Sequence, residues 1–167
     1  MKTLLLILRL ILGGLFIFAA SVKLSDPQGF FDSIHAFKLP AYFSQNLGLH
    51  MGDAAHLERL ATFAVPWLEL LAGLALVFGY CTRGAALVLS ALLVFFLFGI
   101  YTVLARKMDV TCGCFGKFEI PCQGAIGWCH VGRNTVLLAF GLTILSGGSG
   151  RFALEGVKKA CAAPKPA

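Results

Sequence analysis

The sequence is poor in charge. Of its 167 residues only 13% are Asp, Glu, Lys or Arg, whereas 58% are hydrophobic. In soluble domains about a quarter of the residues are charged, so this composition excludes an ordinary water-soluble protein and indicates an integral membrane protein. A chain of this length has room for roughly four spans of about 20 residues, which leaves none for a separate soluble domain.

The chain also lacks any run of basic residues interleaved with aromatic ones. Its 14 Lys and Arg outnumber its 8 Asp and Glu, but they occur singly near the ends of apolar segments. Nucleic-acid-binding proteins gather such charges on one surface. Scattered basic residues beside apolar runs instead indicate anchoring at a membrane surface. We therefore expect a lipid bilayer around the protein and no nucleic-acid partner.

Apolar runs long enough to cross a bilayer lie at about residues 4–22, 60–80, 85–104 and 126–145. Only residues 81–84 separate the second run from the third, so these two helices are expected to be antiparallel. The sequence predicts an all-α membrane protein, a four-transmembrane-helix antiparallel bundle that forms one domain over residues 1–150. A basic, flexible tail is expected over residues 151–167.

The first run could also be a secretory signal peptide. Lys2 gives it a basic start, and Phe18-Ala19-Ala20-Ser21 is similar to a cleavage site with small residues. However, Arg9 interrupts the apolar stretch and Lys23 follows it directly. This pattern favours a retained helix with a cationic end.

A short amphipathic helix is expected after the first run. Asp26 provides a capping side chain and Pro27 suits the first helical turn. Apolar residues then recur at helical spacing over residues 29–38, up to Pro40. We expect this helix to lie in the membrane interface. Nearby His35, His50 and His56 are not clustered, which is more typical of solvated or capping groups than of metal ligands.

Four of the six cysteines gather in the loop between the third and fourth runs and at the start of the fourth. The cluster comprises Cys112, Cys114, Cys122 and Cys129. An apolar scaffold has no packing need for thiols at one water-facing end, so the cluster is expected to do redox chemistry, form structural disulfides or bind a metal. A disulfide within Cys112-Gly113-Cys114 would close a small strained ring, and strain makes such a bond more oxidising. This favours Cys112 and Cys114 as an exchanging pair, with Cys122 and Cys129 as a second pair.

Two other interpretations of the cluster remain open. Together with His130 it offers soft ligands for zinc, copper(I) or mercury, although the spacing matches no common ribbon of paired CxxC motifs. Two structural disulfides that stiffen an exposed loop are the other alternative. Cys81 and Cys161 fall on the opposite side of the predicted bundle, where we expect lone thiols.

Charged residues inside the apolar runs also indicate function. Arg9, Glu69 and Arg133 fall within predicted spans, where an unpaired charge is costly. Glu69 and Arg133 lie at similar distances from the cysteine-rich end of their spans, so we predict that they form an ion pair, with Arg9 as a third member. Such a pair has either a packing role or a role in proton or electron transfer. Arg133 also lies one helical turn beyond Cys129, where its charge would favour a thiolate.

The orientation of the bundle does not follow from charge, because Lys and Arg are equally frequent on the two predicted sides. Disulfides persist outside the cytoplasm. If the clustered cysteines act as disulfides, the cysteine-rich loop is periplasmic and both termini are cytoplasmic.

Several short motifs resemble the DoxX and MauE group of small membrane proteins. The first run and its exit contain Arg9-Leu10-x-Leu12-Gly13, Phe16 and Lys23-Leu24-x-Asp26-Pro27, and the second run contains Pro66-x-x-Glu69-Leu70-x-x-Gly73. The stretch Cys112-Gly113-Cys114-Phe115-Gly116, together with Arg133-Asn134, resembles the branch of the methylamine-utilisation protein MauE. These motifs are distributed over nearly the whole chain.

The resemblance implies an inner-membrane, redox-associated protein, linked to maturation of a disulfide-rich periplasmic enzyme beside a thioredoxin-like partner. It does not establish an enzymatic activity. Our leading hypothesis is a component of thiol–disulfide exchange or electron transfer, in which spans rich in phenylalanine, such as Phe95-Phe96-x-Phe98, could offer a slot for a quinone. The alternatives are a thiol-based heavy-metal binding or transport protein and a non-catalytic assembly factor.

Overall fold

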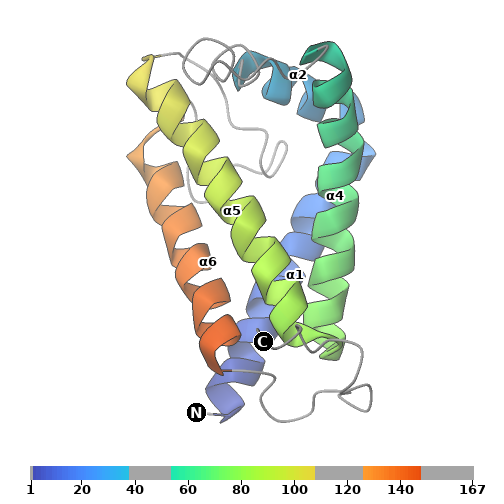
Figure 1. The fold of residues 1–167 in the computed structure, drawn as a ribbon, viewed down its shortest axis with the longest axis vertical. Coiled ribbons are helices and arrows are strands. Elements are labelled where there is room, and N and C mark those ends of the chain that lie inside the picture. The colour runs from blue at the N-terminus through green and yellow to red at the C-terminus, as the bar shows by residue number, and fades with distance from the viewer. Residues whose placement is uncertain (1, 38–53, 108–125, 148–167) are drawn as a thin grey trace, which may run out of the picture.

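The structure, a computed structural model, describes residues 2–37, 54–107 and 126–147, and the regular elements within these ranges are helices joined by short turns. The helices are α1 (Lys2–Ser25), α2 (Pro27–Phe37), α4 (Ala54–Phe78), α5 (Thr82–Ala105) and α6 (Trp128–Gly147). Figure 1 shows the long helices side by side and α2 across one end, which we call the α2 end. The predicted all-α fold is confirmed.

Three of these helices are long and apolar enough to cross a membrane, over Thr3–Ser25, His56–Phe78 and Thr82–Ala105. They coincide with the first three predicted runs, and the chain is a multi-pass membrane protein. Within the described residues, α6 occupies the position of the fourth run but is not among these candidates. Its first turns carry His130, Arg133 and Asn134, which lower its hydropathy. The fourth span therefore stays a prediction.

The bundle is built from two closely packed helix pairs, α1 with α4 and α5 with α6, which also contact each other. Helices α1 and α4 approach where Gly13 faces Gly73. A Cβ atom added at Gly13 would lie 2.9 Å from the carbonyl oxygen of Gly73, and one added at Gly73 would lie 3.0 Å from the carbonyl oxygen of Gly13. Small residues at such crossings let backbones pack closely in a membrane, where burial of apolar surface cannot drive helix association.

Helices α4 and α5 are antiparallel because a tight turn joins them at the end opposite α2. Gly79 has φ 74°, a left-handed conformation that glycine adopts without strain. The N–H of Tyr80 donates to the carbonyl of Ala75 at 2.8 Å, and the N–H of Gly79 donates to the carbonyl of Leu76 at 3.2 Å. This pair of bonds is a Schellman motif, which ends α4 at Phe78. The predicted antiparallel arrangement is confirmed.

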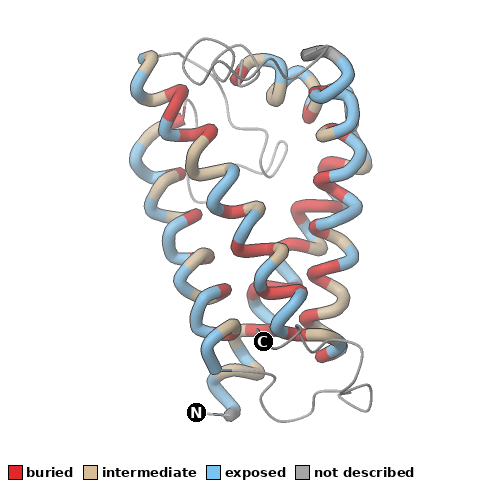
Figure 2. The backbone as a smooth tube through the Cα atoms, in the orientation of Figure 1, coloured by how far each residue is buried: buried red, intermediate tan, exposed pale blue. Residues whose placement is uncertain are grey.

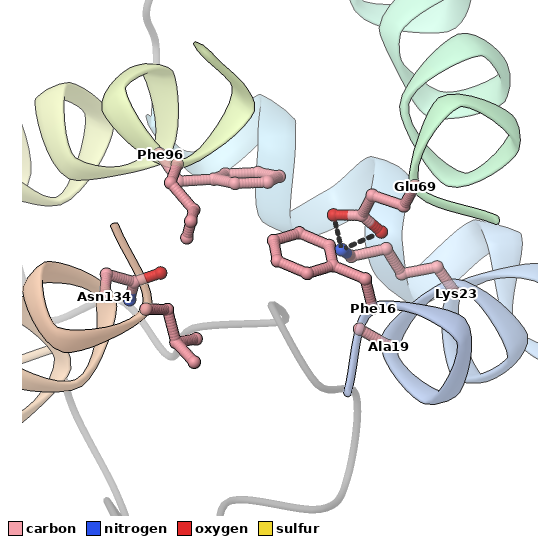
Figure 3. A pocket seen from close by; sticks show the side chains of 8 residues that line it. Phe16, Ala19, Lys23, Glu69, Phe96 and Asn134 are labelled. Carbon is pink, nitrogen blue, oxygen red and sulfur yellow. Dashed lines mark hydrogen bonds and ion pairs between the residues drawn. The ribbon is translucent and has the colours of Figure 1, made fainter. Parts of the chain in front are cut away.

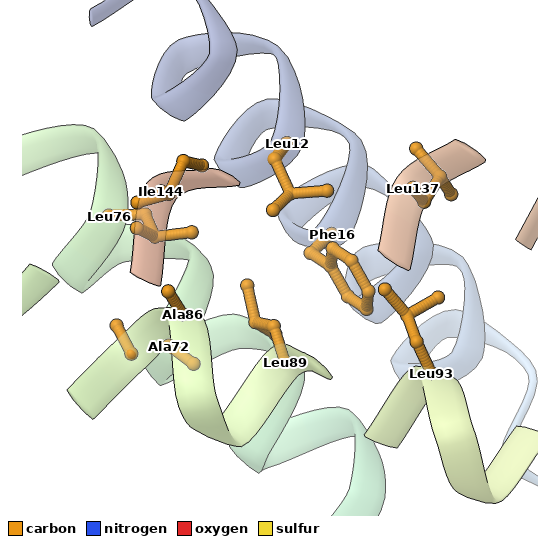
Figure 4. Packing of buried hydrophobic residues seen from close by; sticks show 10 residues of the cluster. Leu12, Phe16, Ala72, Leu76, Ala86, Leu89, Leu93, Leu137 and Ile144 are labelled. Atoms are coloured by element: carbon orange, nitrogen blue, oxygen red, sulfur yellow. The ribbon is translucent and has the colours of Figure 1, made fainter. Parts of the chain in front are cut away.

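The interior is apolar over most of its length, and Figure 4 shows how its side chains from the long helices interdigitate. The buried members of this core are Leu12, Phe16, Ala72, Leu76, Ala85, Ala86, Leu89, Leu93, Leu137 and Ile144. The outer surface is apolar as well, and Figure 2 shows its exposed residues facing away from the bundle. On α4, for example, Leu60, Phe63 and Leu71 are at least 60% exposed. Apolar residues on both the inner and the outer face are expected of a helix in contact with lipid.

Helix α2 begins as the sequence predicts, because Asp26 Oδ1 accepts a hydrogen bond of 3.0 Å from the N–H of Gly29. Its buried residues, Phe30 and Phe37, pack against the bundle. Polar contacts also fix it: Nδ1 of His35 lies 2.9 Å from Oε2 of the buried Glu58 on α4, and the guanidinium of Arg106 on α5 donates to the carbonyl of Phe37. Helix α2 thus closes one end of the bundle. Its place in a membrane interface stays a prediction.

Candidate functional site

A buried ion pair joins α1 to α4 in the half of the bundle nearer α2. The Nζ atom of Lys23 donates hydrogen bonds of 2.6 Å to both carboxylate oxygens of Glu69. The two side chains are only 2% and 1% exposed. Removing two charges from water costs several kcal/mol for each ion, which the attraction between them offsets only when the geometry is good. Two short bonds to one carboxylate meet that condition.

Two aromatic rings flank the ammonium group. The Nζ atom of Lys23 lies 5.2 Å from the ring centroid of Phe30 on α2 and 5.1 Å from that of Phe96 on α5. Both distances fall within the range of cation–π interactions, which gain strength where water is excluded. The ammonium of Lys23 therefore connects four helices, because α2 and α5 contact the pair that α1 and α4 form.

A small cavity borders the ion pair in the middle of the bundle. Its volume is about 20 Å³, and each long helix contributes to its wall. The lining residues are Phe16, Ala19, Lys23, Glu69, Leu93, Phe96, Asn134 and Leu137. In Figure 3, Lys23 and Glu69 lie on one side of this space and Asn134 of α6 on the other, with Phe16 and Phe96 between them. The cavity is thus apolar except at two opposite walls.

Asn134 is buried and is held by its own helix. Its Nδ2 atom donates a 2.8 Å hydrogen bond to the carbonyl of His130, one turn earlier. His130 is also buried, and its Nδ1 atom accepts a hydrogen bond of 3.3 Å from the N–H of Gly127. Side chains of α6 therefore extend the polar region from the cavity to the first turn of that helix.

The predicted pair between Glu69 and Arg133 was wrong, because Glu69 binds Lys23. The prediction treated Lys23 as an anchor just beyond a span that ended at residue 22. Helix α1 instead continues to Ser25, and α2 folds over its last turn, so that Lys23 is enclosed. Arg133 is half-buried on α6 and close enough for its charge to act on Lys23.

Arg9 is buried but is not a third member of that pair. Its Nε and Nη2 atoms donate hydrogen bonds of 3.1 and 3.0 Å to the carbonyl of Leu76. Leu76 lies in the last turn of α4, where carbonyl groups carry a partial negative charge, and its carbonyl also accepts the hydrogen bond from the N–H of Gly79. Arg9 therefore stabilises the end of α4, far from the site that the sequence suggested for it.

Among the predicted cysteines of the cluster, only Cys129 lies within the described residues, while Cys112, Cys114 and Cys122 lie outside them. Cys129 is exposed in the first turn of α6, at the α2 end. It is disulfide-bonded, as is Cys81 at the other end of the bundle. The expectation of a lone thiol at Cys81 was therefore wrong. Cys161, for which a lone thiol is also expected, lies outside the described residues.

The model of the family described as methylamine utilisation protein MauE matches residues 1–147. The chain belongs to the MauE family. No curated protein and no solved structure matches it. The MauE resemblance drawn from short motifs is thus confirmed, whereas the link to DoxX stays a prediction.

The sequence pointed to Glu69 but missed its partner and the cavity. Lys23 and Glu69 each belong to a motif that carried the MauE resemblance, one in the exit of the first span and one in the second. The fold brings these two motifs into contact. The presence of a Lys in one of these motifs and of a Glu in the other was the available signal. No sequence feature indicated that Phe16 and Asn134 would share a cavity with them.

Proposed function

We propose that this MauE protein is a membrane accessory protein that takes part in thiol–disulfide exchange or electron transfer with periplasmic thioredoxin-like or disulfide-rich partners. Cys112 and Cys114 would be the exchanging pair, and Cys122 and Cys129 a second pair. The observation that carries the proposal is the position of Cys129, which is exposed at the α2 end and disulfide-bonded. A disulfide at an accessible position is open to attack by the thiolate of a partner.

The ends of the neighbouring helices support this assignment. Helix α5 ends at Ala105 and α6 begins at Trp128, both at the α2 end (Figure 1). The connection that carries the other three cysteines of the cluster therefore leaves and re-enters the described bundle at one end. This arrangement favours a common location for the exchange chemistry.

The buried charges would support the exchange without taking part in it. Lys23 and Glu69 link α1 to α4, and Phe30 of α2 covers the ammonium. Arg133 lies one turn beyond Cys129 on α6. We propose that these groups hold the helices that present the cysteines, while Arg9 secures the opposite end.

We propose that the protein lies in the inner membrane and that α6 is its fourth span. Both termini would then lie in the cytoplasm, and the α2 end would face the periplasm. Fusions to alkaline phosphatase, which is active only outside the cytoplasm, test it. A fusion after Lys107 is expected to be active and one after Gly147 inactive. If both fusions are active, α6 does not cross the membrane.

Trapping of mixed disulfides tests the chemistry. In cells, one of the variants Cys112→Ser and Cys114→Ser is expected to accumulate a covalent adduct with a thioredoxin-like protein, because that variant keeps the attacking thiol and loses the one that resolves the intermediate. Cys161→Ser, in the tail beyond the family match, is the matched control and should trap none. Metal content is measured in parallel. If the wild type contains a stoichiometric metal that both variants lose, the cysteines bind metal and do not exchange disulfides. If neither an adduct nor a metal is found, the result supports the role of a non-catalytic assembly factor.

A further inference from the structure

We propose that the cavity beside Lys23 and Glu69 is a binding site for a single water molecule, so that the buried ion pair is hydrated inside the bundle. The cavity measures about 20 Å³. A buried cavity needs a volume of roughly 10–15 Å³ to hold one water molecule. The space therefore suits one molecule of water.

Polarity as well as size favours water at this site. Purely apolar cavities stay empty, whereas buried waters make about three hydrogen bonds to polar groups around them. The ammonium of Lys23 has three N–H donors and uses two of them on Glu69. Each carboxylate oxygen of Glu69 retains capacity for a further hydrogen bond. One donor on Lys23 and an acceptor on each carboxylate oxygen of Glu69 are thus available at the wall where the pair lies.

The opposite wall offers another acceptor. Asn134 is only 4% exposed and lines the cavity. Because its Nδ2 atom donates to the carbonyl of His130, its Oδ1 atom is left to face the space shown in Figure 3. An amide placed there would carry a desolvation cost that an alanine or leucine would not. A water in the cavity would lower that cost, as it would for the ion pair.

The remaining walls are apolar. They are formed by Phe16, Phe96, Leu93 and Leu137, and Phe30 covers the ammonium from α2. Water here would therefore be held at the charged side of the cavity. The proposal follows from the geometry of the described residues and is independent of any cysteine chemistry.

Radiolytic labelling of the full chain in lipid nanodiscs tests the proposal. Hydroxyl radicals made by X-rays from bound water modify the side chains next to that water. Phe16 and Phe96 line the cavity and serve as reporters, while Phe140, which packs against the apolar core, is the internal reference. We expect Phe16 and Phe96 to be modified several-fold faster than Phe140. Equal rates for the three rings would overturn the proposal.

A variant that fills the cavity provides the second arm. Ala19 is 3% exposed and lines the space, so Ala19→Leu should exclude water without touching a charge. In this variant the labelling rate of Phe16 and Phe96 should fall to that of Phe140. Ala139 is exposed, so the control variant Ala139→Leu should leave the labelling rate of Phe16 and Phe96 unchanged. Persistent fast labelling in folded Ala19→Leu would place the water elsewhere. If that variant does not fold, the smaller Ala19→Val takes its place, and the wild-type comparison decides the matter by itself.

Discussion

Lys23 and Glu69 are 46 residues apart in the chain, yet the ammonium of one lies 2.6 Å from both carboxylate oxygens of the other. Each residue belongs to a separate motif of those that resemble the DoxX and MauE group. Helices α1 and α4 bring them together inside a membrane bundle, where a charge without a partner is costly. The pair is therefore the strongest polar constraint on how α1 and α4 align.

Removing one partner should be far more harmful than removing both. Glu69→Leu leaves the ammonium of Lys23 buried without its counter-ion, and we expect a loss of about 3–5 kcal/mol in the free energy of unfolding. The double variant Lys23→Met with Glu69→Leu should recover most of this loss, because neither charge remains. Unfolding in detergent micelles, followed by circular dichroism, measures both. Losses that simply add would contradict a direct interaction.

The depth of the buried charges can be predicted by counting residues along each span, but the direction in which their side chains point cannot. Glu69 and Arg133 were placed at similar depth, and the charge of Arg133 does act on Lys23. Depth, however, does not determine how a helix is rotated about its axis. That rotation follows from contacts such as Gly13 against Gly73, which involve two distant segments. The partner of Glu69 could therefore not be chosen by counting residues along each span.

The helices themselves were more predictable than the site, because apolar runs of sufficient length define them. The main error was the start of α4, which begins at Ala54 rather than near residue 60. Its first turns contain His56 and Glu58, which are polar and precede the predicted apolar run. Glu58 is buried and lies 2.9 Å from Nδ1 of His35, so a tertiary contact with α2 stabilises a turn that the hydrophobic pattern does not mark.

The crossing of α1 and α4 should not tolerate even one added carbon. In Gly13→Ala, the new Cβ would lie 2.8 Å from Cγ2 of Val77 and 2.9 Å from the carbonyl oxygen of Gly73. Such overpacking costs about 1–3 kcal/mol, and the backbone atom cannot move aside without shifting α4. Gly14→Ala is the matched control, because nothing lies within 4 Å of its Cβ. It should be neutral or slightly stabilising, since alanine favours a helix by about 0.5–1 kcal/mol.

Thermal unfolding of the two variants in the same detergent distinguishes these outcomes. The midpoint of Gly13→Ala should fall below that of the wild type, while that of Gly14→Ala should not. Equal effects at the two positions would show that helix propensity, and not the crossing, determines the result.

Arg9 should be needed for its shape as well as its charge. Its Nε and Nη2 atoms donate to one carbonyl, that of Leu76, at the end of α4. Arg9→Met removes both donors and should destabilise the fold by about 1–3 kcal/mol. Arg9→Lys keeps the charge but not the planar arrangement of donors, so it should restore only part of the stability.

The exposed Arg59 provides the control for Arg9, because Arg59→Met removes a charge from the same bundle without a buried contact. It should change the free energy of unfolding by less than about 0.5 kcal/mol. If Arg9→Lys matched the wild type, charge alone would account for the role of Arg9.

Ser90 and Gly141 set the approach of α5 to α6, and their effects on stability should be coupled. The hydroxyl of Ser90 is buried without a hydrogen-bond partner in the described part of the chain, and a Cβ added at Gly141 would lie 2.5 Å from it. Gly141→Ala should therefore lower the free energy of unfolding by about 1–3 kcal/mol through this overlap. Ser90→Ala removes a polar group that burial penalises, so it should be neutral or stabilising.

The double variant is the decisive measurement for this pair of helices. With Ser90→Ala in place, the nearest atom to the Cβ at Gly141 would be the Cβ of residue 90, at 3.7 Å, which is an ordinary contact. Gly141→Ala should then cost little, and the alanine should even favour α6 because glycine weakens a helix interior. The coupling energy from the four chemical unfolding curves is expected to exceed about 0.5 kcal/mol, the size found for residues in contact. Additive effects would mean that α5 and α6 separate to accommodate the methyl group, and that the hydroxyl of Ser90 does not limit their approach.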